Sequence, residues 1–231
     1  MRHGLMNAWF CAASSVATVA TATGAPEQQF LQGKGVASKE PTLGWNSWNA
    51  YHCDINAAKF LEAAEAIVDC GIRDAGYTYI DIDDCWQAEG GRVNGHIAVD
   101  KNKSPDAIDG LAKKIHDMNL KIGIYSCYED IDAADWASWG IDYLKDVQRG
   151  VNGTCDLSPE PRLTPPGYDR RTSKSYERFR RMADALARQP REVVYSACIW
   201  GLADVYSWGR EVAASWRMGA DIEPGRGERQ V

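Results

Sequence analysis

The sequence predicts an α/β fold, namely an incomplete TIM-type (β/α)8 barrel with about six of the eight strand and helix units. Strand-type and helix-type apolar patterns alternate along the 231 residues, which is typical of a parallel sheet with right-handed crossovers. A complete barrel usually needs roughly 250 residues, and the alternation stops two units short. An open doubly wound sheet is the rival interpretation, but no glycine-rich phosphate loop follows the first predicted strand.

The spacing of apolar residues and local start signals predict the individual elements. Strand-type runs lie at residues 44–48, 77–86, 121–126, 141–145, 192–200 and 215–222. Apolar residues three or four positions apart predict helices at residues 54–68, 104–118, 130–139, 173–188 and 203–213. Asp54 is the predicted cap of the first helix, and the dipeptide Asn94-Gly95 predicts a hairpin. Prolines and glycines between residues 146 and 169 predict a long loop.

Composition indicates an ordinary globular protein with one main domain. Hydrophobic residues make up 45% and charged residues 25% of the chain, which is long enough to bury a sizeable core. Lys and Arg number 26 against 32 Asp and Glu, so the net charge is −6, and no basic stripe is present. This charge pattern argues against a nucleic-acid partner.

The two ends of the chain differ in composition from its middle. Residues 1–25 begin with Arg2 and His3, continue with small apolar residues, and resemble a secretory signal cleaved near Ala22 or Ala25. A disordered leader is the alternative, and the segment is too short and too polar for a strong membrane span. We expect a linker over 26–40, the barrel domain over 41–222 and a tail over 223–231. The chain is therefore expected to be secreted, without a membrane partner.

Cysteine usage agrees with a secretory route. Of seven cysteines, Cys11 would leave with the leader, and the other six have no CxxC or HxxxH spacing typical of zinc sites. The tripeptide Asn152-Gly153-Thr154 is a glycosylation sequon. The sequence implies no metal and no organic cofactor, and it indicates no particular oligomeric state.

The strand predicted at 77–86 ends in the adjacent carboxylates Asp83 and Asp84, followed by Cys85 and Trp86. Adjacent acids lose solvation on burial, so they favour a ligand rich in hydroxyl groups, a metal or a cation. A neighbouring aromatic ring favours a sugar. A solvated acid pair in a loop is the alternative. In a barrel, parallel strand ends converge on one face, and the residues expected there are Trp48, Asp83, Asp84, Tyr125, Lys145, Trp200 and Asp221.

Several ordered motifs carry a family resemblance: GWNSW, YIDIDDCW, KIGIYS, IDAADWASWGIDYLK, YSACIWG and SWRMGADI. They resemble successive strands of glycoside hydrolase family 27, the melibiases or α-galactosidases, and most of all the secreted fungal members. The resemblance implies a full barrel with a carboxy-terminal β-sandwich, retaining hydrolysis of terminal α-galactosyl groups, and a galactose-containing oligosaccharide or polysaccharide as partner. It does not separate galactose from N-acetylgalactosamine or arabinopyranose.

The resemblance also implies roles for single residues. Asp221 matches the general acid/base, with capping of a local turn as the alternative reading. A disulfide between Cys53 and Cys85 is implied as well. Lys145 would contact the sugar near the nucleophile, although a lysine can also extend its charge to solvent at a pocket rim. The full set of implied substrate-binding residues is Trp48, Asp83, Asp84, Tyr125, Lys145, Cys198, Trp200 and Arg217.

The departures from the family pattern concern catalysis. The family nucleophile lies two residues after the lysine, where this chain has Val147. Because strand side chains alternate, Val147 shares the inward face with Lys145, and Asp146 is expected to point outward. Asp146 could replace the nucleophile only if the strand ended at Lys145 and the backbone turned. Ile199 also replaces a polar family residue.

Other family segments are absent from the sequence, including a cysteine after the nucleophile, two barrel strands and the sandwich. Missed splice boundaries or a decayed gene copy would explain these gaps. The first functional hypothesis is an α-galactosidase with impaired catalysis, and the second is a galactose-binding pseudoenzyme. Unpaired edge strands raise the further question of whether the open barrel folds stably.

Overall fold

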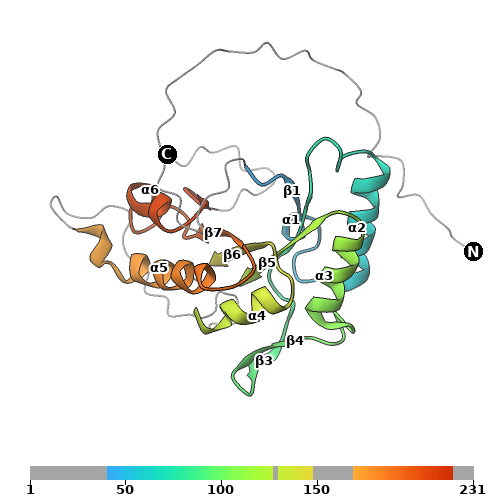
Figure 1. Ribbon diagram of the computed structural model, residues 1–231, viewed down its shortest axis with the longest axis horizontal. Coiled ribbons are helices and arrows are strands. Elements are labelled where there is room, and N and C mark those ends of the chain that lie inside the picture. Colours follow the sequence, from blue (N-terminus) through green and yellow to red (C-terminus); the bar gives the residue numbers. More distant parts are fainter. Residues whose placement is uncertain (1–40, 127–129, 148–168, 221–231) are drawn as a thin grey trace, which may run out of the picture.

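The computed structural model of the chain describes residues 41–126, 130–147 and 169–220 (Figure 1). Within them, six parallel strands form one sheet in the order β1-β2-β5-β6-β7-β8, and two further strands form a hairpin. The sheet strands are β1 (Gly44–Asn46), β2 (Tyr79–Ile82), β5 (Lys121–Ser126), β6 (Tyr143–Val147), β7 (Val194–Cys198) and β8 (Ser215–Trp216). This parallel half-barrel confirms the predicted fold class, and no β-sandwich occurs among the described residues.

Helices connect the strands and lie outside the sheet (Figure 1). They are α1 (Trp48–Tyr51), α2 (Ala57–Asp69), α3 (Ala107–Asp117), α4 (Ala133–Ser138), α5 (Lys174–Ala187) and α6 (Val205–Trp208). Short 3-10 turns accompany them at Asp130–Asp132, Arg170–Thr172 and Gly209–Glu211. Because each strand pairs in parallel with its neighbours, the carboxyl ends of all six strands lie at one end of the sheet.

The two faces of the sheet differ in polarity. Side chains that point toward the helices are apolar and nearly inaccessible, among them Ile80, Ile122 and Leu144. They pack with helix residues such as Phe60 and Phe179 in one hydrophobic core. Burial of this outer face drives the fold, because apolar surface gains about 25 cal/mol for each Å² removed from water. The inner face is left for polar residues, and the candidate site lies there.

Side-chain caps fix where the main helices begin. Asn56 caps α2, since its Oδ1 atom accepts a hydrogen bond of 3.1 Å from the Lys59 amide. The prediction of Asp54 as this cap is wrong, because Asp54 lies two positions before the cap and forms an ion pair with Lys59 instead. Ser173, the first residue of the helix predicted over 173–188, caps α5: its Oγ atom accepts a hydrogen bond of 3.0 Å from the Tyr176 amide.

Several predicted boundaries differ from the structure. The first strand ends at Asn46 rather than at Trp48, because the Asn46 side chain accepts a hydrogen bond of 2.9 Å from the Trp48 amide and the backbone turns into α1. The fourth strand covers Tyr143–Val147 rather than 141–145, since it pairs with β7 as far as Cys198. The predicted helix at 203–213 is only a short α6 and a 3-10 turn, after positive φ angles at two residues.

The predicted hairpin is present as β3 (Gln87–Val93) and β4 (His96–Val99), and it turns at Asn94-Gly95 with positive φ at both residues. A bidentate ion pair anchors it to the body of the protein: the two terminal nitrogens of Arg92 lie 2.7 and 2.6 Å from the two carboxylate oxygens of Asp132. The hairpin is therefore tied to the 3-10 turn at Asp130–Asp132.

Some sequence predictions lie outside the described residues. These are the leader over 1–25, the linker over 26–40, most of the loop over 146–169 with the Asn152 sequon, the tail over 223–231 and the acid/base candidate Asp221. Along the described ranges, no helix combines the length and apolar character that crossing a membrane requires.

Candidate functional site

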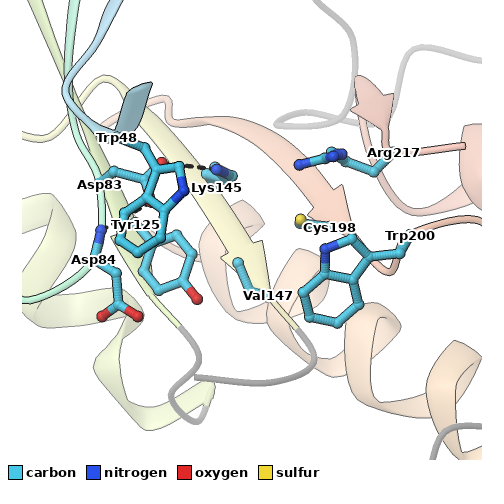
Figure 2. Close-up of a pocket in the computed structure, with 9 residues that line it drawn as sticks. All are labelled: Trp48, Asp83, Asp84, Tyr125, Lys145, Val147, Cys198, Trp200 and Arg217. Carbon is cyan, nitrogen blue, oxygen red and sulfur yellow. Dashed lines mark hydrogen bonds and ion pairs between the residues drawn. The ribbon is translucent and has the colours of Figure 1, made fainter. Parts of the chain in front are cut away.

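A pocket at the carboxyl ends of the parallel strands gathers residues from all six strands of the sheet and the segments that follow them (Figure 2). Its lining consists of Trp48, Asp83, Asp84, Tyr125, Lys145, Val147, Cys198, Trp200 and Arg217. All eight substrate-binding candidates predicted from the sequence are among these residues. The structure thus brings together side chains separated by up to 169 residues of chain, because parallel strands end at the same place.

Asp83 is held in place by three donors. Its Oδ2 atom accepts hydrogen bonds from the Lys145 ammonium at 2.7 Å and from the Asn46 side chain at 2.8 Å. Its Oδ1 atom accepts the Asp84 amide at 2.9 Å. Sequence reasoning missed Asn46, although its place at the end of the first strand, beside the strand of Asp83, is the signal that could have found it.

Asp84 lies beside Asp83 but is bound differently. Its Oδ1 atom accepts the Cys85 amide at 2.7 Å, and the Tyr125 hydroxyl donates a hydrogen bond to its carboxylate. Burial first, and then the Asp84 and Asp83 carboxylates, raise the pKa of Tyr125 far above its usual range. Tyr125 therefore stays a neutral hydrogen-bond donor at any pH the protein meets.

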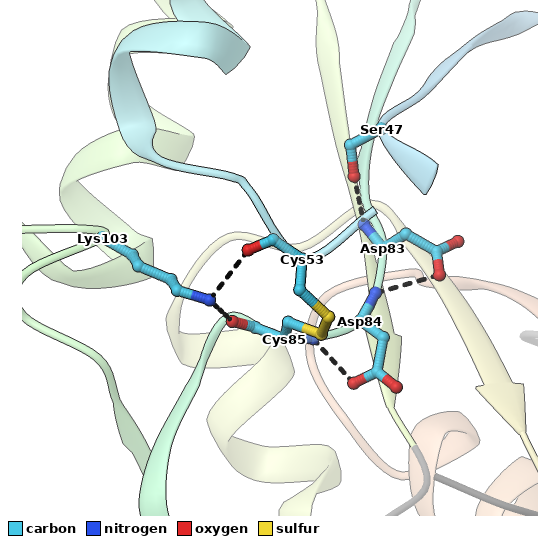
Figure 3. The surroundings of a disulfide bond; sticks show 6 residues. All are labelled: Ser47, Cys53, Asp83, Asp84, Cys85 and Lys103. Atoms are coloured by element: carbon cyan, nitrogen blue, oxygen red, sulfur yellow. Dashed lines mark hydrogen bonds between the residues drawn. A yellow bond between two sulfur atoms is a disulfide. The ribbon is translucent and has the colours of Figure 1, made fainter. Parts of the chain in front are cut away.

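The disulfide between Cys53 and Cys85 fixes the loop that carries the acid pair (Figure 3), as the family resemblance implies. The Lys103 ammonium donates to both cysteine carbonyl oxygens, at 2.5 Å for Cys85 and 3.2 Å for Cys53. On the other side, the Ser47 hydroxyl accepts the Asp83 amide at 3.0 Å. The backbone at the end of β2 is thus held from the loops that follow β1 and the hairpin.

Trp200 and Arg217 reach the pocket from the ends of the last two strands. The Arg217 amide donates to the Ala197 carbonyl and the Gly201 amide donates to the Arg217 carbonyl, both at 3.0 Å. Gly201 has a φ of 76°, and a Cβ atom there would overlap the Met218 carbonyl, so only glycine allows the two loops to approach this closely. This contact aims the Arg217 side chain toward Lys145 (Figure 2).

Val147 lies in the pocket where the family nucleophile is expected, and Asp146 does not. The Asp146 carboxylate points to the opposite face of β6. There it accepts hydrogen bonds from the Arg178 guanidinium at 2.6 Å and from the Tyr195 hydroxyl at 2.5 Å. The residue is fully buried; burial raises the pKa of its carboxyl, while Arg178 and Tyr195 oppose that change. Asp146 as a replacement nucleophile is therefore wrong for this conformation, because β6 continues to Val147 instead of turning after Lys145.

A second layer of polar residues lies on the inner face beneath the pocket. Asp81 is on the same side of β2 as Asp83, two residues earlier, and burial raises its pKa to about 7. On β6, burial likewise raises the pKa of Tyr143 to about 12, and its hydroxyl is hydrogen-bonded with Ser196 and Ser215. Sequence reasoning missed this layer, although an acid sharing the face of Asp83 is a visible signal.

The pocket offers hydrogen-bonding groups of both kinds next to flat apolar surface. Two carboxylates accept, an ammonium and a guanidinium donate, and the rings of Trp48, Tyr125 and Trp200 supply the apolar faces. The Lys145 ammonium also lies 5.3 Å from the centre of the Tyr125 ring. In the described part of the chain, no three His, Cys, Asp or Glu side chains are arranged to hold a metal ion. Such a lining matches a polyhydroxylated, uncharged ligand.

The fold and the site together define a partial (β/α)8-barrel protein with a pocket of charged and aromatic side chains at the carboxyl ends of its strands. A sequence model of the Melibiase_2 family, described as alpha galactosidase A, matches residues 40–223. The chain belongs to this family, as its motifs predict.

Known relatives agree with this assignment. A protein of Neosartorya fischeri named "Probable alpha-galactosidase B" is 46% identical over 226 residues, which are 82% of this chain and 50% of the relative. Alpha-galactosidase I of Mortierella vinacea matches with a TM-score of 0.67 and 37% identity over 79% of this chain and 46% of that one. An alpha-galactosidase of Saccharomyces cerevisiae solved with raffinose matches with a TM-score of 0.67 and 33% identity, over 80% of this chain and 40% of that one. The chain thus spans about half the length of the curated relatives it matches.

Proposed function

We propose that the pocket binds the terminal α-D-galactosyl group of an oligosaccharide or polysaccharide. The observation that carries this proposal is the gathering of Asp83, Asp84, Lys145 and Arg217 around aromatic rings in one pocket. Family membership supports the choice of sugar, and so does the yeast relative that was solved with raffinose.

The contacts within the pocket suggest how the sugar is held. Asp83 already accepts three hydrogen bonds from the protein, so its carboxylate has room for about one more from a ligand. Asp84 lies beside it in the same pocket, and the two carboxylates together are the proposed partners of neighbouring sugar hydroxyls. Lys145 donates from beside Asp83, and Arg217 donates from the opposite side of the pocket (Figure 2). Trp48 and Trp200 contact the C–H faces of the ring.

Hydrolysis is the second candidate function, and family membership favours it. The retaining mechanism needs two carboxyl groups about 5 to 5.5 Å apart, one as nucleophile and one as acid/base. Asp221 is the proposed acid/base. At the position expected for the nucleophile the pocket contains the Val147 side chain, which cannot attack an anomeric carbon. This observation favours galactoside binding without efficient turnover for the chain itself.

Two assays on the purified full chain distinguish these functions. Calorimetry with galactose measures binding, and release of nitrophenol from a nitrophenyl α-galactoside measures turnover. We expect binding that Arg217→Met weakens roughly tenfold, since it removes a charged donor. Arg180→Met is the matched control, because Arg180 is exposed on α5, forms an ion pair with nearby Asp184 and does not line the pocket. Absence of galactose binding in the wild type contradicts the proposal, whereas turnover that is lost in Asp221→Asn establishes the second function.

We also propose that the chain is secreted and glycosylated. The apolar leader over 1–25, the disulfide and the sequon at Asn152 support this. Expression in a fungal host, with amino-terminal sequencing of protein from the medium and treatment with an endoglycosidase, tests it. Retention of the protein in the cells with an intact amino terminus would contradict it.

A further inference from the structure

The Asp81 carboxylate occupies a niche on the inner face of the sheet, one layer beneath the pocket. It lies opposite Gly123 of β5 in the sheet register, and a Cβ atom on Gly123 would overlap the Asp81 Oδ1 atom. The lack of a side chain at Gly123 is what makes room for the acid. Among the described residues, the inaccessible Oδ1 atom has no hydrogen-bond partner.

The surroundings of Asp81 connect it to the pocket. Asp83, directly after the same strand, adds negative charge, and Lys145 on β6 adds the compensating positive charge. Tyr143 on β6 also lies close enough to feel the Asp81 charge. The neighbouring positions on β1 and β5 are Asn46 and Gly123, which do not titrate. Two carboxylates therefore face one ammonium, and only Asp83 holds it in an ion pair, at 2.7 Å.

We propose that Asp81 is a positioning residue of the pocket that acts through Lys145, the cation it shares with Asp83. When Asp81 is protonated, the Lys145 ammonium interacts with Asp83 and can donate a hydrogen bond to a hydroxyl group of the ligand. When Asp81 is ionised, a second anion attracts the ammonium inward and away from the ligand. The raised pKa of Asp81, about 7, puts this change near neutral pH. The consequence for ligand affinity rests on the proposed galactoside binding, whereas the coupling of Asp81 to Lys145 does not.

The coupling is tested without any ligand. Carbon NMR of aspartate-labelled protein follows the carboxyl signal of Asp81, which is identified by its loss in Asp81→Asn. We expect a titration midpoint near 7 in the wild type and a higher midpoint in Lys145→Met, because the lysine favours the ionised acid. A midpoint near the ordinary 3.8, or one that Lys145→Met leaves unchanged, overturns the proposal.

The effect on the pocket is tested by galactose calorimetry at about pH 5.5 and about pH 8.5, on either side of the Asp81 midpoint. We expect wild-type affinity to fall roughly fivefold to tenfold at the higher pH, and Asp81→Asn to lose most of this fall. Asp184→Asn, which removes an exposed acid of α5, should behave as the wild type.

An unchanged pH dependence in Asp81→Asn overturns the positioning role. Absence of galactose binding at both pH values contradicts the proposed function instead, and the NMR midpoints then decide the coupling of Asp81 to Lys145 by themselves. The two failures are therefore distinguishable.

Discussion

The ammonium of Lys145 on β6 lies 2.7 Å from the Oδ2 atom of Asp83, which directly follows β2, and so reaches across β5, the strand between them. This ion pair joins three neighbouring strands at their carboxyl ends, where the sheet has no helix to cover its inner face. Both charges are substantially buried, with 21% and 3% of their side chains exposed. The pair therefore has a structural role as well as a place in the pocket.

Removing one member of this pair should be more harmful than removing both. Lys145→Met leaves the buried Asp83 carboxylate without its counter-ion, and we expect a loss of about 2 to 4 kcal/mol in the free energy of unfolding. The double variant Lys145→Met/Asp83→Asn should regain part of that loss, because no lone charge remains. Urea denaturation of the wild type, the two single variants and the double variant measures the free energy of unfolding of each. Strictly additive losses would contradict the coupling of the two charges.

A carboxylate at position 147 should restore the nucleophile that the retaining reaction needs. Val147→Asp places an acid on the inward face beside Lys145, and we expect α-galactoside hydrolysis above the wild-type level. The change should also cost about 2 to 4 kcal/mol of stability, since Val147 is fully buried. Nitrophenol release measures the gain.

Val147→Asn is the matched control for this gain, because Asn is nearly the same size as Asp and also polar but has no nucleophilic carboxylate oxygen. The gain should also vanish in Val147→Asp/Asp221→Asn. Equal activity of the Asp and Asn variants at position 147 would show that the carboxylate is not the reacting group.

Asp146 should matter for stability and not for the pocket. Asp146→Asn leaves the Arg178 guanidinium, whose side chain is only 18% exposed, without an anion, and we expect a loss of roughly 3 kcal/mol in chemical denaturation. Galactose affinity should stay within about twofold of the wild type, because the Asp146 carboxylate lies on the opposite face of β6. Asp184→Asn, from an exposed pair, should cost at most about 0.5 kcal/mol. A selective loss of affinity in Asp146→Asn would mean that the acid does reach the pocket.

The disulfide should stabilise both the fold and the acid pair. Cys53 and Cys85 are 32 residues apart, and closing a loop of this length stabilises a protein by about 3 to 4 kcal/mol in the chain-entropy description. We expect Cys53→Ser/Cys85→Ser to lose about that much and to bind galactose more weakly, since Asp84 accepts the Cys85 amide. A reductant should lower the stability and the galactose affinity of the wild type in the same way, and it should change neither quantity in the double variant.

Strand order and the composition of the pocket were predictable, because both depend on periodic patterns. Alternation along 143–147 predicts Lys145 and Val147 on one face and Asp146 on the other, and the structure has them there. The alternation of side chains did not predict the residue at which each strand ends. Trp48 enters a helix because the Asn46 side chain caps its amide, and β6 continues to Val147 because Cys198 of β7 pairs with it.

Asp81 shows a different limit of sequence reasoning. The sequence shows that it shares a face with Asp83, but its effect depends on which residue of the next strand lies beside it. Only the sheet register, which pairs Asp81 with Gly123 and places Lys145 nearby, shows that the acid is enclosed and shares a cation. Registers between distant strands depend on packing of the whole sheet, which no local pattern encodes.

The enclosed Asp81 predicts an unusual pH dependence of stability. Burial raises its pKa from the ordinary 3.8 to about 7, although Lys145 partly opposes the change. The folded protein therefore holds this proton more tightly than the unfolded chain does. The resulting stabilisation is complete below about pH 4 and disappears as the pH rises through about 7. Between these pH values we expect the free energy of unfolding of the wild type to fall by about 2 to 4 kcal/mol relative to that of Asp81→Asn. Urea denaturation at each pH measures it. Because Asn cannot ionise and has nearly the same shape, the difference between the two proteins isolates Asp81 from all other groups. Parallel stability curves for wild type and variant would place the Asp81 carboxylate in contact with water instead.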